Sequence, residues 1–243
     1  MLVMGYIMDN LLKNRSSFVA GRRVWEVDFL RGLALLLMIV FHLIWDLNEF
    51  YDYPLDYSQG FIALIGTVAA YLFILLTGIS CTFSSNNPKR AARILLAAVL
   101  ITVATYLYDP GSFIAFGILH LLGVCVLLYP LVKNLSQLLL FVYGLLSIAI
   151  GRFFLQLSIR TNMLLVFGLR NADYYSLDYY PLFPYFGLFL FGVAIAKRYY
   201  LSKTSLFSRQ LPANPISFFG RHTLVVYLLH QPLIMVTLRF LSA

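Results

Sequence analysis

Long apolar segments constrain the fold of this chain more than any other feature of its sequence. A helix rises about 1.5 Å per residue, so about 20 apolar residues cross a hydrocarbon core about 30 Å thick. We therefore predict an all-α integral membrane protein, a bundle of about seven transmembrane helices. The predicted spans are residues 28–47, 59–82, 91–108, 113–132 and 135–154, a sixth that follows residues 179–186 and ends at Arg198, and residues 217–240.

Composition supports a single membrane domain. Hydrophobic residues make up 61% of the 243 residues and charged residues 12%, whereas soluble domains carry about 25% charged residues. We expect residues 25–243 to form one transmembrane unit, preceded by a cytoplasmic or interfacial segment at residues 1–24. The net charge of +8 does not indicate a nucleic-acid partner, because basic residues in a membrane protein first report its topology.

The distribution of charge predicts the orientation. With a cytoplasmic N-terminus, thirteen Lys and Arg residues lie inside and four outside, with Arg31 at the boundary; this is the positive-inside pattern. Residues 161–170 are too short to span and are expected to be interfacial or re-entrant. Tyrosines crowd the outer connections, where they would form an aromatic belt or, in part, stack on a sugar. They are Tyr51, Tyr53, Tyr57, Tyr174, Tyr175, Tyr179 and Tyr180.

Three of the four histidines fall inside predicted spans, at similar expected depths: His42, His120 and His230. An ionisable group at such depth is expensive and is by default a functional hypothesis, although each could simply bind a neighbouring helix. Histidine titrates near neutrality and serves as a general base or an acyl carrier. We predict that the three share one polar cavity. Asp46, one turn after His42, would orient its imidazole or mark the outer interface.

Basic residues form a second candidate site on the cytoplasmic side. Bidentate arginines suit phosphates, so a nucleotide-bearing acyl donor such as acyl-CoA would dock there; the alternative is ordinary positive-inside topology with anionic lipid contact. The two cysteines, Cys81 and Cys125, are expected to be free thiols. No metal site is expected, because the histidine spacing is not that of structural zinc. The predicted donor-binding residues are Arg22, Arg23, Arg31, Lys89, Arg90 and Arg93, with Asp28 beside Arg31.

These residues carry a resemblance to a known family. Asp28, Arg31 and Gly32 form a D-x-x-R-G opening, and a polar residue, His42, follows the arginine by eleven positions. This pattern resembles the first helix of the heparan-α-glucosaminide N-acetyltransferase catalytic family and of wider transmembrane acyltransferases. Residues 178–192 and 218–234 are similar to the family's closing helices. With His42 in place of the asparagine of the lysosomal branch, the chain looks more like the branch that O-acetylates polysaccharides.

The resemblance implies acyl transfer within the plasma membrane. Acyl-CoA, most simply acetyl-CoA, would bind from the cytoplasm beside Arg31, and a saccharide or lipid-linked glycan would accept the acyl group on a hydroxyl or amine. His42 would act at the reacting atoms, with His120 and His230 completing the polar site. Membrane lipid is an expected partner, and homodimer formation is left open. The alternatives are a transporter and a haem- or quinone-binding electron carrier.

Overall fold

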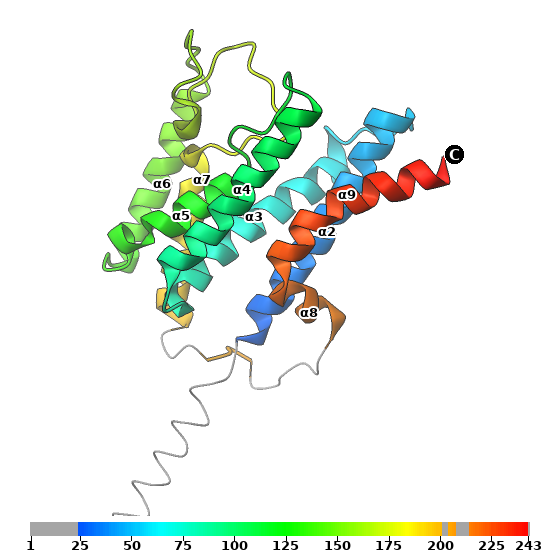
Figure 1. The fold of residues 1–243 in the computed structure, drawn as a ribbon. Coiled ribbons are helices and arrows are strands. Elements are labelled where there is room, and N and C mark those ends of the chain that lie inside the picture. The colour runs from blue at the N-terminus through cyan, green and yellow to red at the C-terminus, as the bar shows by residue number, and fades with distance from the viewer. Residues whose placement is uncertain (1–23, 201–203, 208–213, 243) are drawn as a thin grey trace, which may run out of the picture.

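The computed structural model describes residues 24–200, 204–207 and 214–242, and within them all regular structure is helical (Figure 1). The predicted N-terminal segment, residues 1–24, lies outside this part of the chain except for Val24. The helices are α2 (Trp25–Tyr51), α3 (Gly60–Phe83), α4 (Asn87–Tyr108), α5 (Ile118–Val132), α6 (Gln137–Phe154), the short 3₁₀ helix η1 (Leu165–Phe167), α7 (Leu182–Tyr199), α8 (Pro215–Arg221) and α9 (Thr223–Leu241).

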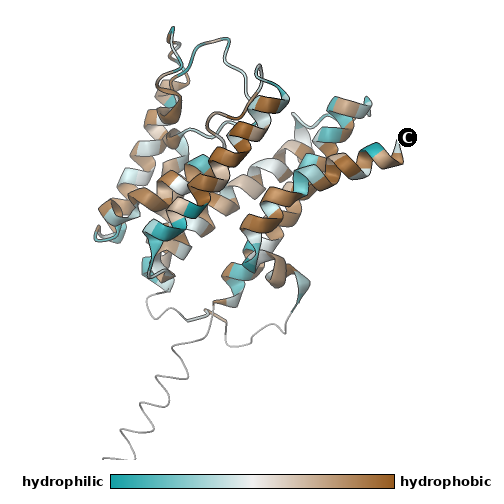
Figure 2. Ribbon diagram, in the orientation of Figure 1, coloured by the Kyte–Doolittle hydropathy of each residue, from teal (hydrophilic) through white to brown (hydrophobic). Residues whose placement is uncertain are grey.

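The helices have the length and composition of a multi-pass membrane protein. Helices α2, α3, α4, α6 and α9 are each long and apolar enough to cross a membrane. The other two predicted spans correspond to α5, an apolar helix of 15 residues, and α7, whose 18 residues end shortly after Lys197 and Arg198. Most residues of the helices are apolar, and polar residues are more frequent toward the connections and helix ends (Figure 2). Residues 161–170 contain only η1 and do not span, as predicted.

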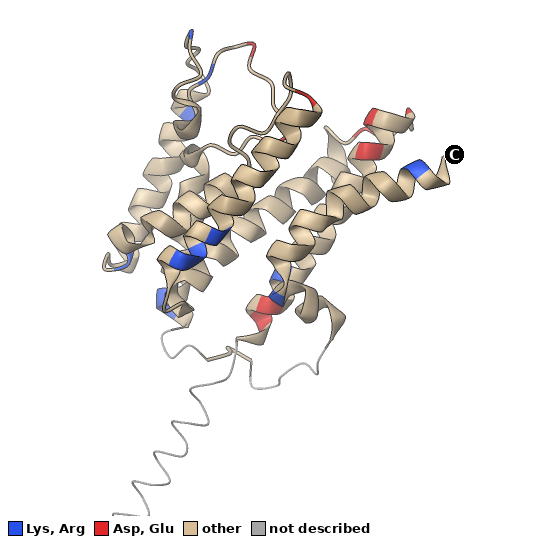
Figure 3. Ribbon diagram, viewed as in Figure 1, with Lys and Arg blue, Asp and Glu red and all other residues tan. Residues whose placement is uncertain are grey.

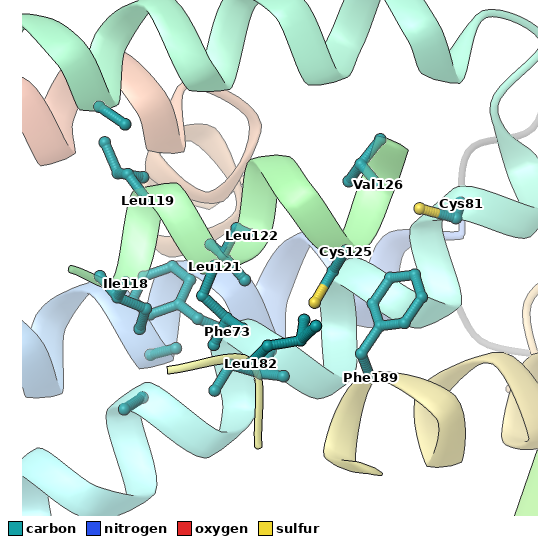
Figure 4. Close-up of a cluster of buried hydrophobic side chains, with 14 of the residues drawn as sticks. Phe73, Cys81, Ile118, Leu119, Leu121, Leu122, Cys125, Val126, Leu182 and Phe189 are labelled. Carbon is teal, nitrogen blue, oxygen red and sulfur yellow. The ribbon is translucent and has the colours of Figure 1, made fainter. Parts of the chain in front are cut away.

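Helices α3 and α7 form the centre of the bundle. Helix α6 packs on α7, α5 packs on both α3 and α7, α4 covers α5, and α2 lies against α3. Figure 4 shows the apolar cluster where α5 side chains meet those of α3 and α7, among them Leu121, Phe73 and Phe189. Cys81 and Cys125 are buried in this cluster as free thiols.

Local sequence signals fix several helix ends. The side chain of Asn86 accepts a hydrogen bond from the backbone N–H of Lys89 at 3.1 Å, and Pro88 occupies the first turn of α4. Ser136 caps α6 in the same way through the N–H of Leu139. These contacts satisfy N–H groups that the helix itself leaves unpaired. The predicted third span at 91–108 therefore begins earlier, at Asn87.

The predicted last span, 217–240, is wrong in one respect: it is two helices that meet at His222. Helix α8 packs on the start of α2 at very close range. A Cβ added to Gly32 would lie 2.0 Å from the carbonyl oxygen of Ile216, and one added to Gly220 would lie 1.8 Å from that of Asp28. The two glycines thus allow backbone contact between α8 and α2. This contact fixes where α9 begins, and α9 then runs along α2 in the same direction (Figure 1).

Candidate functional site

Two of the three predicted histidines meet where α9 lies along α2. The rings of His42 and His230 are in edge-to-face contact, with centroids 4.9 Å apart. His42 is partly buried and His230 is 6% exposed. Of the three histidines predicted to share one cavity, His42 and His230 therefore lie together.

Backbone carbonyls fix the same tautomer in both imidazoles. Nδ1 of His42 lies 3.0 Å from the carbonyl oxygen of Met38, and Nδ1 of His230 lies 2.5 Å from that of Tyr227. A carbonyl oxygen only accepts, so each Nδ1 carries the hydrogen and each Nε2 of the neutral ring keeps its lone pair. Among the described residues neither Nε2 has a hydrogen-bond partner, and that of His230 is fully buried. The pair thus presents two Nε2 atoms that can accept a hydrogen bond.

Asp46 occupies a different place from the predicted one. Its side chain is 0% exposed, so it does not mark the outer interface. Both carboxylate oxygens accept hydrogen bonds from Nε2 of Gln231, at 2.7 and 3.0 Å, and no hydrogen bond joins Asp46 to His42. Since Gln231 follows His230 directly, this contact holds α9 in register with α2. Asp46 therefore positions His230 through Gln231 and does not orient His42.

His120 is not brought together with the other two histidines. The predicted span 113–132 begins at Ile118 instead, so His120 lies in the first turn of α5. Its Nδ1 accepts a hydrogen bond from the N–H of Gly117 at 3.2 Å, and its Nε2 therefore donates to Oγ1 of Thr102 at 3.1 Å. Both ring nitrogens are occupied. His120 joins α4 to the start of α5, no ring contact joins it to His42 or His230 among the described residues, and the cavity shared by all three histidines stays a prediction.

Arg31 is held at the opposite end of α2 from Asp46. Its guanidinium forms a salt bridge with Asp28 at 2.9 Å and donates a hydrogen bond to the hydroxyl of Ser80 on α3. Eleven residues separate Arg31 from His42, which places them about 16 Å apart along the helix axis. Arg31 thus lies in the bundle on the side predicted to be cytoplasmic, well below the histidine pair.

The remaining predicted cations separate into two classes. Arg90 is partly buried, and among the described residues its guanidinium has one polar contact, Sγ of Cys81 at 4.0 Å, and no carboxylate. Lys89 and Arg93 are exposed. Figure 3 shows the basic residues of α4 gathered near its N-terminal end. Arg22 and Arg23 lie outside the described residues, so Arg31 and Arg90 are the predicted donor-binding residues that the structure places inside the bundle.

Sequence reasoning missed Asp178, which it did not select as a candidate site residue. Its Oδ2 accepts a hydrogen bond from the N–H of Ile118, the first residue of α5, at 2.9 Å. A Cβ on Gly117 would lie 2.2 Å from the same oxygen. Burial raises the pKa of Asp178 to about 6, against the lowering effect of the hydrogen bond. A signal in the sequence could have indicated Asp178, because this residue begins the segment 178–192 that resembles the family.

We also searched the described residues for groups of side chains that could bind a metal ion. Across residues 24–200, 204–207 and 214–242, no three His, Cys, Asp or Glu side chains are grouped so that they could hold a metal ion.

Comparison with known proteins identifies the family. The family model described as "Heparan-alpha-glucosaminide N-acetyltransferase, catalytic" matches residues 23–232, most of the chain. No curated protein and no solved structure matches significantly. The match spans the helix that carries His42, the loop that carries Asp178 and the segment that carries His230 and Gln231. The chain is a multi-pass membrane protein that belongs to the heparan-alpha-glucosaminide N-acetyltransferase catalytic family, a family of membrane acetyltransferases.

Proposed function

We propose that this protein transfers an acetyl group from cytosolic acetyl-CoA to a hydroxyl or amine of a saccharide or lipid-linked glycan across the plasma membrane. The observation that carries the proposal is the His42–His230 contact, with both Nε2 lone pairs unpaired among the described residues. Family membership favours this reaction over the transporter and electron-carrier alternatives.

Two hydrogen-bond acceptors at the histidine site have no donor among the described residues. Nε2 of His230 and Oε1 of Gln231 are both buried without a partner among the described residues. The amide of Gln231 must turn its NH₂ toward the Asp46 carboxylate, so its oxygen faces away as an acceptor. Leaving buried acceptors unpaired costs about 1–3 kcal/mol each. An acceptor hydroxyl or amine supplies the missing donor, which is the chemistry expected of the substrate that loses a proton.

The donor would enter from the other end of the bundle. Arg90 has no carboxylate partner in the described chain, and Arg31 lies beside it across Ser80 and Cys81 of α3. Buried guanidinium groups bind phosphate through charge-assisted hydrogen bonds. The CoA phosphates would bind there, and the pantetheine arm would cover the roughly 16 Å to His42 along α2.

The proposed step balances as a general-base acyl transfer. Nε2 of His42 removes the proton from the acceptor hydroxyl or amine while that oxygen or nitrogen attacks the thioester carbonyl. The carbonyl carbon forms its new bond, the C–S bond breaks, and the CoA thiolate leaves and takes the proton from the imidazolium. A positioned general base contributes about 10²–10⁴-fold to the rate.

The test uses purified protein reconstituted in liposomes with radiolabelled acetyl-CoA. We expect His42→Ala to lower turnover about 10²–10⁴-fold. The unfolding temperature of this variant should change little. His222→Ala is the matched control, because His222 also places Nδ1 on a carbonyl one turn earlier, that of Phe218, but is exposed. Wild-type turnover in His42→Ala would contradict the proposed role.

A further inference from the structure

The outer loop before α7 is fastened to the segment that precedes α5. The hydroxyl of Ser176 donates to the carbonyl of Phe113 at 3.0 Å, and the N–H of Leu177 donates to that of Ser112 at 3.0 Å. Directly after Leu177, Asp178 accepts from the N–H of Ile118. These bonds, together with the Tyr180 N–H bond to the carbonyl of Phe116 at 3.1 Å, hold the Asp178 carboxylate in one place.

One of the two carboxylate oxygens of Asp178 accepts a hydrogen bond from the protein. Oδ2 accepts from the N–H of Ile118, while Oδ1 has no hydrogen-bond donor among the described residues. A carboxylate oxygen that no protein group pairs with is normally paired with water or with a ligand. The free oxygen is therefore available to bind a hydroxyl or an amine.

Tyrosines connect this carboxylate to the histidine pair. Asp178 lies within electrostatic range of Tyr180, Tyr185 and Tyr227. The rings of Tyr180 and Tyr185 are 4.9 Å apart, and the ring of Tyr227 lies 5.3 Å from that of His230. No hydrogen bond occupies the hydroxyl groups of these three tyrosines within the described part of the chain. The side chains of these tyrosines thus lie between Asp178 and His230.

We propose that Asp178 and Tyr227 bind the acceptor and set its orientation toward the histidine pair. This inference rests on the proposed function and adds to it the residues that select the acceptor. The carboxylate oxygen accepts from an acceptor O–H or N–H, and the aromatic rings provide the flat apolar surfaces on which polyhydroxylated molecules pack. Donor and acceptor would then reach the histidines from opposite ends of α2.

The test measures sugar binding apart from catalysis. Glucosamine and methyl α-glucoside are titrated into the purified protein, and the rise in its unfolding temperature reports binding to the folded state. We expect Asp178→Asn to weaken binding about tenfold or more, because losing a charge-assisted hydrogen bond costs about 1.5–3 kcal/mol. The amide oxygen introduced by this substitution can still accept from the N–H of Ile118, so the loop contact is kept. Tyr227→Phe retains the ring and should also weaken binding.

Asp173→Asn is the matched control, because it removes a charge from an exposed position of the same loop. Equal loss of binding in this control, unchanged binding in Asp178→Asn and Tyr227→Phe, or no sugar-dependent shift in the wild type would each overturn the proposal. Release of CoA from acetyl-CoA is followed in parallel. Binding that depends on Asp178 without CoA release in any sample would refute the proposed function and leave the acceptor site standing.

Discussion

His42 and His230 stand edge to face with ring centroids 4.9 Å apart, although they lie in the first and last long helices of the described chain. Each is held by a backbone carbonyl of its own helix, so neither depends on the other for its orientation. Their contact depends instead on how α9 lies along α2. The relation between the two helices is therefore as important for the site as the two imidazoles themselves.

The two histidines should act as a unit. We expect His42→Ala and His230→Ala each to lower turnover strongly, and the double variant to lower it little further, because residues that share one step are non-additive. The measurement is a double-mutant cycle on the rate of CoA release. Fully additive losses would show that the two imidazoles contribute independently.

Breaking the Asp46–Gln231 contact should destabilise the protein more than removing both partners. Gln231→Leu leaves a buried carboxylate without its donor, whereas Asp46→Leu with Gln231→Leu leaves none. A buried group deprived of its partner costs about 1–3 kcal/mol, and more when charged. We expect the unfolding temperature to fall in the single variant and to recover in the double variant. Gln156→Leu, at an exposed position, is the control, and a similar fall there would contradict the assignment.

Much of the architecture could be predicted from hydropathy, because a membrane requires each span to satisfy its own backbone hydrogen bonds. The contact of the first and last spans through His42 and His230 was also predictable in kind, from the cost of ionisable groups at that depth. The break at His222 could not be predicted. It follows from the approach of Gly220 to the carbonyl of Asp28, a tertiary contact that leaves no periodic signal.

The differences between the predicted and the observed positions share one physical cause. His120 and Asp46 were placed by counting along ideal helices, but residues 113–117 are not helical and Asp46 faces α9 rather than solvent. Asp178 was missed because its partner, the N–H of Ile118, lies 60 residues away. The sequence shows which polar residues lie in predicted spans, whereas the hydrogen-bond partners of these residues depend on how the helices pack.

The glycine contact between α8 and α2 should control the histidine pair at a distance. Gly220→Ala would place a Cβ 1.8 Å from the carbonyl oxygen of Asp28, so α8 must move away and carry the start of α9 with it. We expect lower turnover and a lower unfolding temperature. Gly111→Ala is the control, because its Cβ would meet only the flexible side chain of Asp109, at 3.3 Å. Unchanged turnover in Gly220→Ala would show that α9 is positioned by other contacts.

Arg90 should determine the affinity for acetyl-CoA. We expect Arg90→Gln to raise the KM for acetyl-CoA about tenfold or more, since a charge-assisted hydrogen bond contributes about 1.5–3 kcal/mol, with a smaller effect on kcat. Lys89→Gln, one residue earlier and exposed, removes the same charge and should leave KM nearly unchanged. Equal effects of the two substitutions would indicate general electrostatic attraction rather than a specific phosphate contact.

Asp178 should make stability depend on pH in an identifiable window. Its pKa is raised from 3.8 to about 6 by burial, so the folded protein holds this proton more tightly than the unfolded chain. Between about pH 4 and pH 6 the folded state binds more protons, and the contribution of Asp178 to stability therefore falls as pH rises through that window. Asp178→Asn removes this dependence. We expect the unfolding temperature of the wild type, relative to the variant, to decline from about pH 4 to about pH 6 and to stay level above it. A difference that grows with rising pH would mean that the hydrogen bond from Ile118 outweighs burial at this carboxylate.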